Sequence, residues 1–407
     1  MSKLITNTVR HVDGSNDNIT LDSSQNVTVE GNLTVDGTST LTGQLKANAL
    51  RHTGASSDAV TLASDGTCTA KITNNLSNRN IIINGAMAID QRKNGASSDT
   101  TGDVYLSCDR FKSLYAAASK FTIQQVASTL SGFEKALKIT SAAATTASSS
   151  QHYLMEYNFE GHDVARLALG TSDAKTFTLS FYVKSSLTGN FSVSFNNGAD
   201  NRCYATTYNI ASAATWERKT ITVAGDTTGT WTTDNTEGLA IKWDLGSGSN
   251  FDVTANTWSA VDKFKVAGSV ALVATSGATL EITGVQLEVG DVATDFEHRS
   301  YGDELLRCER YYQVKTGYCG HVVSSSAIYI VGPLNPTMRA TPTVGATAAI
   351  IINDASVNDT QSSINVGQTD ITNRGWFCEC GNFDSLTSNR PALQRPNGGS
   401  FTFAAEL

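Results

Sequence analysis

Apolar and polar side chains alternate one by one along much of this chain, which is the pattern of strands with one buried face. In residues 177–183, Phe, Leu, Phe and Val alternate with polar residues and a tyrosine, and the same rhythm returns in 191–195 and 239–245. In residues 280–287 the apolar phase slips by one position at Gly284. A β-bulge at Gly284 would keep the same face buried across the slip. The pattern therefore predicts an all-β fold built from sandwich strands.

One short segment has the apolar spacing of a helix instead. Residues 303–312 follow Ser300, and the Ser300-x-x-Asp303 spacing predicts an N-terminal cap, with Leu305, Cys308 and Tyr312 on one helix face. All five prolines lie after this segment. That shift in composition predicts a separate C-terminal β domain, in which strands are expected at four places: 328–331, 350–352, 376–380 and 401–403.

The N-terminal part contains an internal repeat at an offset of 41 residues, in which 7–28 returns as 48–69. Between the copies, glycine recurs every six residues, at positions 31, 37 and 43. Such a thin strip has too little apolar area to fold alone, because small domains barely offset their chain entropy. Three copies wound together would supply a shared core, so the repeat favours an intertwined trimeric stalk over a flexible Ser/Thr/Gly linker.

Composition and charge exclude several classes of function. Apolar residues make up 40% and charged residues 17% of the chain, and its net charge is −8 without a basic run, which argues against a nucleic-acid partner. The longest apolar runs are far shorter than the roughly 18 residues of a membrane span. The N-terminus lacks the features of a secretion signal. The seven cysteines are expected to be free and mostly buried, with Cys378 and Cys380 in a core rather than on a metal.

Groups that would support catalysis are sparse. The six histidines are dispersed, and His11 and His52 occupy equivalent repeat positions that favour a structural role. Polysaccharide cleavage would need two facing carboxylates, for which Asp295 with Glu297 and Glu156 with Glu160 are the candidates. A turn or an ion pair with Arg299 is the plainer role for the first pair. The sequence predicts no catalytic residue, no metal site and no cofactor, and hence not an enzyme.

Sugar binding fits the composition better, because sugars are held by aromatic rings together with amide, carboxylate and basic groups. Trp243 alternates with aliphatic residues and is expected in the core. Trp231 and Trp258 are the preferred surface aromatics for a receptor or sugar, although packing remains an equal alternative. A second candidate patch lies in the C-terminal domain and consists of Trp376, Arg374, Asn382 and Arg390.

Three segments together resemble a known family. They are residues 80–92 with Cys108-Asp-Arg-Phe111, residues 284–312, and residues 333–342, which read Pro-Leu-Asn-Pro-Thr-Met-Arg-Ala-Thr-Pro. Together they resemble tail fibres and related receptor-binding proteins of tailed bacteriophages, especially phages of marine bacteria and cyanobacteria. Aromatic residues tend to stand in those proteins where this chain has Met87 and Asp90, which puts an aromatic binding role of the opening strand in doubt. The resemblance implies a homotrimeric virion protein with a central jelly-roll module similar to carbohydrate-binding modules.

Residues and resemblance together predict an elongated homotrimer. Residues 1–79 would be the intertwined stalk and virion-attachment region, 80–300 the central jelly-roll-like β-sandwich, 301–316 a connector helix, and 317–407 a small C-terminal β-sandwich that serves as a receptor-binding tip. The expected function is a phage tail fibre that attaches to a host surface glycan or other receptor. A structural adaptor or capsid decoration fibre that binds other virion proteins is the alternative, followed by a polysaccharide depolymerase.

The expected partners follow from that interpretation. They are further copies of the chain, tail or other virion proteins at the N-terminal region, and a host glycan at the distal β domains, without nucleic acid or membrane insertion. The expected location is the virion, after synthesis in the cytoplasm of the host bacterium.

Overall fold

The structure is a computed structural model, and the chain divides into two units, Met1–Ile72 and Thr73–Leu407. It describes residues 8–9, 19–21, 27–29, 49–50, 60–62, 64, 68–70, 78–99, 104–354, 358–361, 365–395 and 398–407. Within these ranges the protein is all-β with short helices, as predicted. None of the helices in the described ranges is long and apolar enough to cross a membrane.

The first unit contains the same small antiparallel sheet twice. One sheet has the order β1-β2-β3 and the other β4-β5-β6. Their strands are β1 (Thr8–Val9), β2 (Ile19–Leu21), β3 (Val27–Val29), β4 (Ala49–Leu50), β5 (Val60–Leu62) and β6 (Cys68–Ala70). The register repeats as well, because Thr20 pairs with Thr28 in one copy and Thr61 with Thr69 in the other. The sequence repeat is thus a structural repeat. The glycines at 31, 37 and 43, and His11 and His52, lie outside the described residues.

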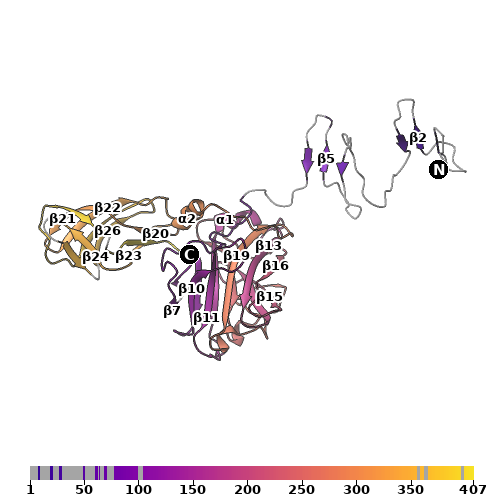
Figure 1. The fold of residues 1–407 in the computed structure, drawn as a ribbon, viewed down its shortest axis with the longest axis horizontal. Coiled ribbons are helices and arrows are strands. Elements are labelled where there is room, and N and C mark those ends of the chain that lie inside the picture. Colours follow the sequence, from indigo (N-terminus) through magenta and orange to yellow (C-terminus); the bar gives the residue numbers. More distant parts are fainter. Residues whose placement is uncertain are drawn as a thin grey trace. The chain divides into compact units, whose positions relative to one another are not determined.

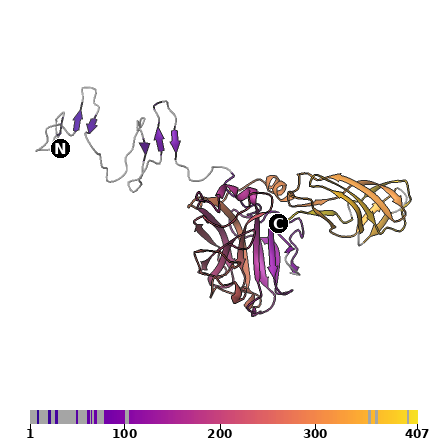
Figure 2. The same ribbon diagram turned by 180° about the vertical axis from the view of Figure 1, so that it is seen from behind.

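The second unit begins with a central β-sandwich of jelly-roll type (Figures 1 and 2). Its six-stranded sheet has the order β16-β13-β19-β11-β10-β7 and its seven-stranded sheet the order β18-β15-β14-β17-β12-β9-β8. The first sheet consists of β7 (Ser98–Asp99), β10 (Phe121–Ala127), β11 (Lys135–Ser141), β13 (Phe177–Ser185), β16 (Glu217–Val223) and β19 (Thr279–Val289). The second consists of β8 (Val104–Tyr105), β9 (Phe111–Tyr115), β12 (Tyr153–Glu160), β14 (Gly189–Asn197), β15 (Cys203–Ile210), β17 (Glu237–Asp244) and β18 (Trp258–Ser259).

The core between the sheets is filled by the alternating apolar residues that the sequence singled out. Every second residue from Phe177 to Val183 and from Leu239 to Leu245 is fully buried, and Trp243 is among them. The predicted bulge is confirmed, because the pairing of β13 with β19 shifts between Ser180 and Tyr182, opposite Gly284. Leu280, Ile282, Val285 and Leu287 all remain in the core across the shift.

The ends of the central sandwich are tied together by buried polar contacts. The Asn80 amide N–H donates to Glu297 at 2.8 Å, and the Arg299 guanidinium donates to the backbone oxygens of Asn80 and Ile82. Glu304 accepts from the Asn84 amide N–H and pairs with Arg299 at 3.4 Å. Buried backbone groups need such partners, so the opening segment is fixed against the closing segment.

Helix α2 (Tyr301–Glu309) follows the closing segment, and the Ser300 hydroxyl accepts from the Asp303 amide N–H, which confirms the predicted cap. The sequence-based interpretation ran the helical pattern to Tyr312 and the connector helix over 301–316, and both of these ends are wrong. The helix ends at Glu309 and Tyr312 begins β20 (Tyr312–Lys315), whose edge pairing with the end of the chain outweighs helix continuation.

The rest of the unit is a second, smaller β-sandwich. Sheet β20-β29-β23 faces sheet β25-β24-β28-β21-β22-β27-β26 across a core around Trp376 and Phe403. The strands are β21 (Cys319–Ser324), β22 (Ala327–Pro333), β23 (Thr343–Ala346), β24 (Ile350–Asn353), β25 (Asn358–Gln361), β26 (Asn365–Ile371), β27 (Gly375–Gly381), β28 (Pro391–Gln394) and β29 (Phe401–Ala404). The four predicted C-terminal strands are confirmed, as β22, β24, β27 and β29.

The last residues of the chain dock onto the central sandwich. The fully buried guanidinium of Arg110 pairs with the Glu406 carboxylate and lies 3.5 Å from the centre of the Tyr311 ring. Arg92 pairs with the same carboxylate at 2.8 Å, and the Leu407 backbone oxygen accepts from Tyr105. Because buried charges are tolerated only when paired, Glu406 holds the second sandwich to the first.

We expect Gly284→Ala to destabilise the protein more than Gly277→Ala. Both glycines have positive φ (61° and 75°), so each alanine costs about 1–2 kcal/mol in the backbone. At Gly284 the new Cβ would also lie 2.8 Å from the Phe133 ring and 2.9 Å from the Tyr182 ring, whereas at Gly277 it meets nothing within 4 Å. Overpacking adds about 1–3 kcal/mol. Urea unfolding measures the loss of unfolding free energy in both variants. Equal losses would contradict the expected overpacking at the bulge.

Glu406→Ala should cost about 3–5 kcal/mol of stability, because it leaves the Arg110 charge buried without its partner. Arg307→Met is the matched control. It breaks the Asp303–Arg307 pair, whose side chains are 44% and 36% exposed, and should cost less than about 1 kcal/mol. Denaturant unfolding compares the two variants, and a similarly small loss in both would contradict the role given to Glu406.

Candidate functional site

The outer face of the seven-stranded sheet is polar, and part of it is covered by another segment of the chain. On β12, Met155 and Tyr157 point into the core, so Leu154 and Glu156 point to the other face, yet both are almost fully buried. The segment 249–267 contains the edge strand β18, and its residues on either side of that strand lie over this face. The Val266 amide N–H binds the segment to the sheet by donating to the Ser192 hydroxyl of β14 at 3.0 Å. We call this segment the covering loop.

A hollow of about 160 Å³ lies between the covering loop and the sheet. Its lining is Leu114, His152, Leu154, Asp200, Lys242, Phe251, Asp262 and Phe264, and we call it the sheet-face groove. Phe251 and Phe264 are stacked with ring centres 4.5 Å apart and supply the aromatic wall. The volume is below the roughly 300–1,000 Å³ of drug-sized pockets, so the groove suits a ligand with a single ring.

Lys242 lies at the centre of the charges in the groove. Its ammonium is 2.8 Å from Asp200, 3.7 Å from Glu156 and 5.9 Å from the centre of the Phe264 ring. Lys112 lies 3.8 Å from the other oxygen of Glu156. The Lys242 side chain is 8% exposed, whereas that of Asp200 is 49% exposed. The groove therefore presents a partly open carboxylate over a buried ammonium.

Burial and these charges shift several pKa values. Burial lowers the pKa of Lys242, but the carboxylates of Glu156 and Asp200 outweigh this effect and hold that pKa above its ordinary value. Burial raises the pKa of Glu237 to about 7, and the Glu156 carboxylate adds to the shift. Burial and the Asp200 carboxylate also raise the pKa of Asp262. With its pKa held high, Lys242 stays a charged hydrogen-bond donor in the groove at neutral pH.

The structure brings Trp231 and Trp258 together, with ring centres 5.5 Å apart in an edge-to-face contact. Both rings are half-buried and pack on the core, and their indole N–H groups donate to the backbone oxygens of Thr228 and Ala224. Their polar atoms are thus occupied within the protein, and the geometry favours the packing role that the sequence left open. A sugar-binding role for this pair stays a prediction.

The predicted patch in the C-terminal domain does not come together. Trp376 is 2% exposed and lies in the core between the two sheets, because it shares the inner face of β27 with Cys380. The prediction of Trp376 as a surface group is therefore corrected. Arg374 precedes β27 and Asn382 follows it, so they lie at opposite ends of that strand, and exposed Arg390 precedes β28. These three remain separate candidates.

The predicted carboxylate pairs have structural partners. Glu297 lies 3.7 Å from Arg299, which confirms the ion pair suggested by the sequence. Glu160 accepts two hydrogen bonds from Arg310, at 2.9 Å and 2.8 Å. Glu156 does not line the sheet-face groove but lies 3.7 Å from Lys242, which does. Of the cysteines whose side chains are described, Cys108, Cys203 and Cys308 are free and buried, Cys380 is buried, and Cys319 is free and exposed.

Sequence reasoning missed most of the groove. Asp200, Lys242 and Asp262 were not singled out, because a polar residue that alternates with core residues is normally solvent-exposed. One signal was present in the sequence. Phe251 and Phe264 bracket a long segment between strands, which is consistent with a loop that folds back over a sheet.

No protein-family profile and no curated protein matches the sequence. Solved structures with similar folds include a putative sugar binding protein from Bacteroides thetaiotaomicron (TM-score 0.33, 12% identity, covering 52% of this chain and 100% of that one). They also include the enzymatically active domain of bacteriophage CBA120 tailspike protein 4 (TM-score 0.28, 13% identity, 52% of this chain). The match spans only 21% of that tailspike chain.

A family 11 carbohydrate-binding module from Clostridium thermocellum is similar over 50% of this chain and 99% of its own (TM-score 0.26, 12% identity). These likenesses to sugar-binding and tailspike domains are weak, and they establish neither a ligand nor a partner of this chain.

We expect the stability difference between the wild type and Glu237→Gln to depend on pH. Folded Glu237 keeps its proton up to about pH 7, whereas the unfolded chain loses it near the ordinary pKa of 4.5. Between these values the unfolded state binds fewer protons, so wild-type stability falls as pH rises, and the glutamine variant lacks this contribution. Asp109 and Asp244, whose pKa values burial raises to about 6, contribute equally to both proteins. Urea unfolding across this window measures the difference, and a constant difference would contradict the assignment.

Proposed function

We propose that this chain is a non-enzymatic, glycan-binding attachment protein, a homotrimeric tail fibre of a tailed bacteriophage. The observation that supports glycan binding best is the buried Lys242, which lies between Glu156 and Asp200 at the floor of a groove with an aromatic wall. Sugar rings need an apolar face for their C–H groups and fixed donors and acceptors for their hydroxyls, and the groove offers both.

The charges in the groove are arranged in advance of any ligand. Lys242 and Glu156 are held by the sheet, and Lys263 and Lys265 fix the covering loop through the Asp252 backbone oxygen at 2.7 Å and the Asp252 carboxylate at 3.0 Å. A ligand hydroxyl therefore meets groups that lose little freedom on binding, which favours affinity in a small site.

A trimer would strengthen a weak single site. The two small sheets of the first unit have strands of two or three residues each, too short for independent stability without a further apolar partner. Copies of the same chain can supply that partner, and three linked sandwiches would multiply the avidity for a repeating surface glycan.

The test uses the intact chain on an array of bacterial surface polysaccharides. Asp200→Asn and Lys242→Met should each weaken binding by at least about tenfold, which corresponds to ~1.4 kcal/mol. Lys184→Met is the matched control and should bind like the wild type. Lys184 also pairs with a carboxylate, Glu281, at 2.6 Å and lies over an aromatic ring, but on the other sheet.

Several outcomes would overturn the proposal. Binding to isolated tail or capsid protein without any glycan binding would favour a structural adaptor. Release of reducing ends from the polysaccharides would contradict the non-enzymatic part. Sedimentation of the same samples reports the assembly, and a stable monomer would exclude the trimer.

A further inference from the structure

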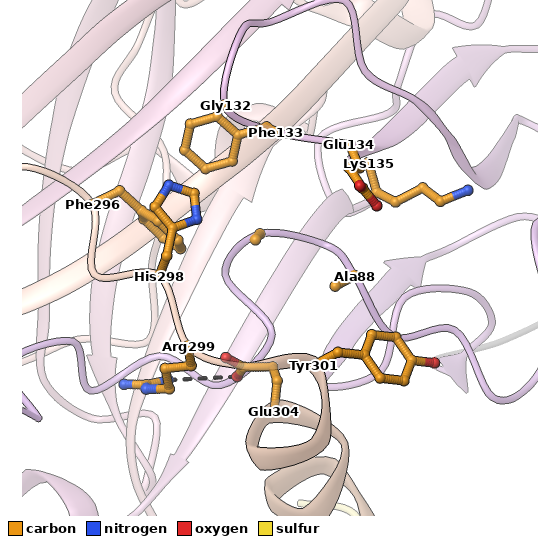
Figure 3. A pocket seen from close by; sticks show the side chains of 11 residues that line it. Ala88, Gly132, Phe133, Glu134, Lys135, Phe296, His298, Arg299, Tyr301 and Glu304 are labelled. Atoms are coloured by element: carbon orange, nitrogen blue, oxygen red, sulfur yellow. Dashed lines mark hydrogen bonds and ion pairs between the residues drawn. The ribbon is translucent and has the colours of Figure 1, made fainter.

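A second hollow, of about 360 Å³, opens beside the N-terminus of α2. Three stretches line it, which are Ala86 with Ala88, residues 132–135, and residues 296–304 (Figure 3). We call it the aromatic pocket. Figure 3 shows Phe133 and His298 on one side of the hollow, with Glu134 and Lys135 across from them. None of these residues belongs to the sheet-face groove.

The aromatic wall is a cluster of three rings. The Phe133 ring centre lies 5.1 Å from that of Phe296 and 5.1 Å from that of His298, and Phe296 and His298 are 4.9 Å apart. Tyr301, at the rim, is 65% exposed. These rings are only partly covered although they lie beside a well-filled core, so core packing does not account for their position.

Two glycines make room for this wall. A Cβ at Gly284 would lie 2.8 Å from the Phe133 ring, and a Cβ at Gly85 would lie 2.1 Å from the Val285 backbone oxygen and 3.3 Å from the Phe296 ring. The Phe133 ring thus packs against the bulge in β19. The Phe296 ring packs where the opening segment approaches β19 closely. Arg299 ties that segment to the pocket floor through the Ile82 backbone oxygen at 2.9 Å. The pocket is therefore formed before any ligand arrives.

The polar groups at the rim are available to a ligand. The side chains of Glu134, Lys135 and His298 form no hydrogen bond or ion pair with any residue that the structure describes. Arg299, in contrast, is engaged by Glu304 at 3.4 Å and Glu297 at 3.7 Å. The available charges are thus one carboxylate and one ammonium, which balance each other. A charged ligand would face a like charge on one side, so the rim suits a neutral ligand with hydroxyl groups.

We propose that the aromatic pocket is a second carbohydrate site, which takes one neutral sugar residue. The sugar's C–H face packs on Phe133 and Phe296, and its hydroxyls donate to Glu134 and accept from Lys135. The volume lies within the roughly 300–1,000 Å³ of small-ligand sites. The choice of a sugar as ligand rests on the proposed glycan-binding function, whereas the pocket itself is independent of the sheet-face groove.

The test is a titration of the intact chain, labelled with carbon-13 at alanine methyl groups, with neutral methyl hexosides and their N-acetyl and uronic acid counterparts. Ala86 and Ala88 line the pocket, so their methyl signals report its occupancy. Concentrations up to about 50 mM reveal a Kd in the millimolar range. We expect at least one neutral sugar to shift both signals in a saturable way.

Matched variants connect the shifts to the rim. Lys135→Met and His298→Ala should each raise the Kd at least about tenfold, or ~1.4 kcal/mol. Lys138→Met, on the same strand but outside the pocket, should leave it unchanged. Thermal unfolding of each variant verifies that it is folded.

The outcomes separate this pocket from the groove. Shifts at Ala86 and Ala88 that persist in Lys242→Met support the pocket even if that variant abolishes binding to polysaccharide. No shift with any sugar, a preference for the uronic acids, or equal effects of Lys135→Met and Lys138→Met would each overturn the proposal. Polysaccharide binding that depends on Lys242 would still stand in those cases.

Discussion

The Arg299 guanidinium closes the central sandwich, and the rest of the described second unit depends on that closure. It donates to the backbone oxygens of Asn80 and Ile82, more than 200 residues earlier in the chain, while Glu297 and Glu304 neutralise its charge. Unpaired backbone groups in a core are costly, so this one side chain fixes the opening segment and the start of α2 together. Arg299 also lines the aromatic pocket, and α2, which leads to the second sandwich, begins two residues after it.

Buried charges recur where the protein joins its parts, and each has a partner from a distant segment. Arg110 is satisfied by Glu406, which brings the end of the chain onto the first sandwich, and Lys242 is satisfied by Asp200 and Glu156 beneath the covering loop. The Arg110–Glu406 pair is almost completely buried, so it serves stability. The arrangement around Lys242 stays open on the side of Asp200, and an open, preorganised charge pair is suited to binding.

The sequence predicted those features whose cause is local. Alternation predicted the core strands, the phase slip at Gly284 predicted the bulge, and Ser300 predicted the helix cap. The 41-residue repeat was detected in the sequence, but the two equal sheets that it forms were not predicted. The sequence did not predict the features that depend on contacts between distant segments of the chain. The helix was drawn past Glu309 because pairing of β20 with β29 is not visible locally. Trp376 was read as exposed because its strand neighbours do not reveal which face the small sheet covers, and Lys242 went unnoticed because its burial depends on the covering loop.

We propose that a glycan binds on the central sandwich, at the outer face of the seven-stranded sheet. Hydrogen–deuterium exchange of the intact chain, with and without a bound surface polysaccharide, tests this claim most directly. The account predicts slower exchange in the covering loop, at residues 249–267, and around Asp200, with little change in β21, β22 and β27 of the C-terminal domain. Protection confined to the C-terminal domain, or absent from both sandwiches, would contradict it.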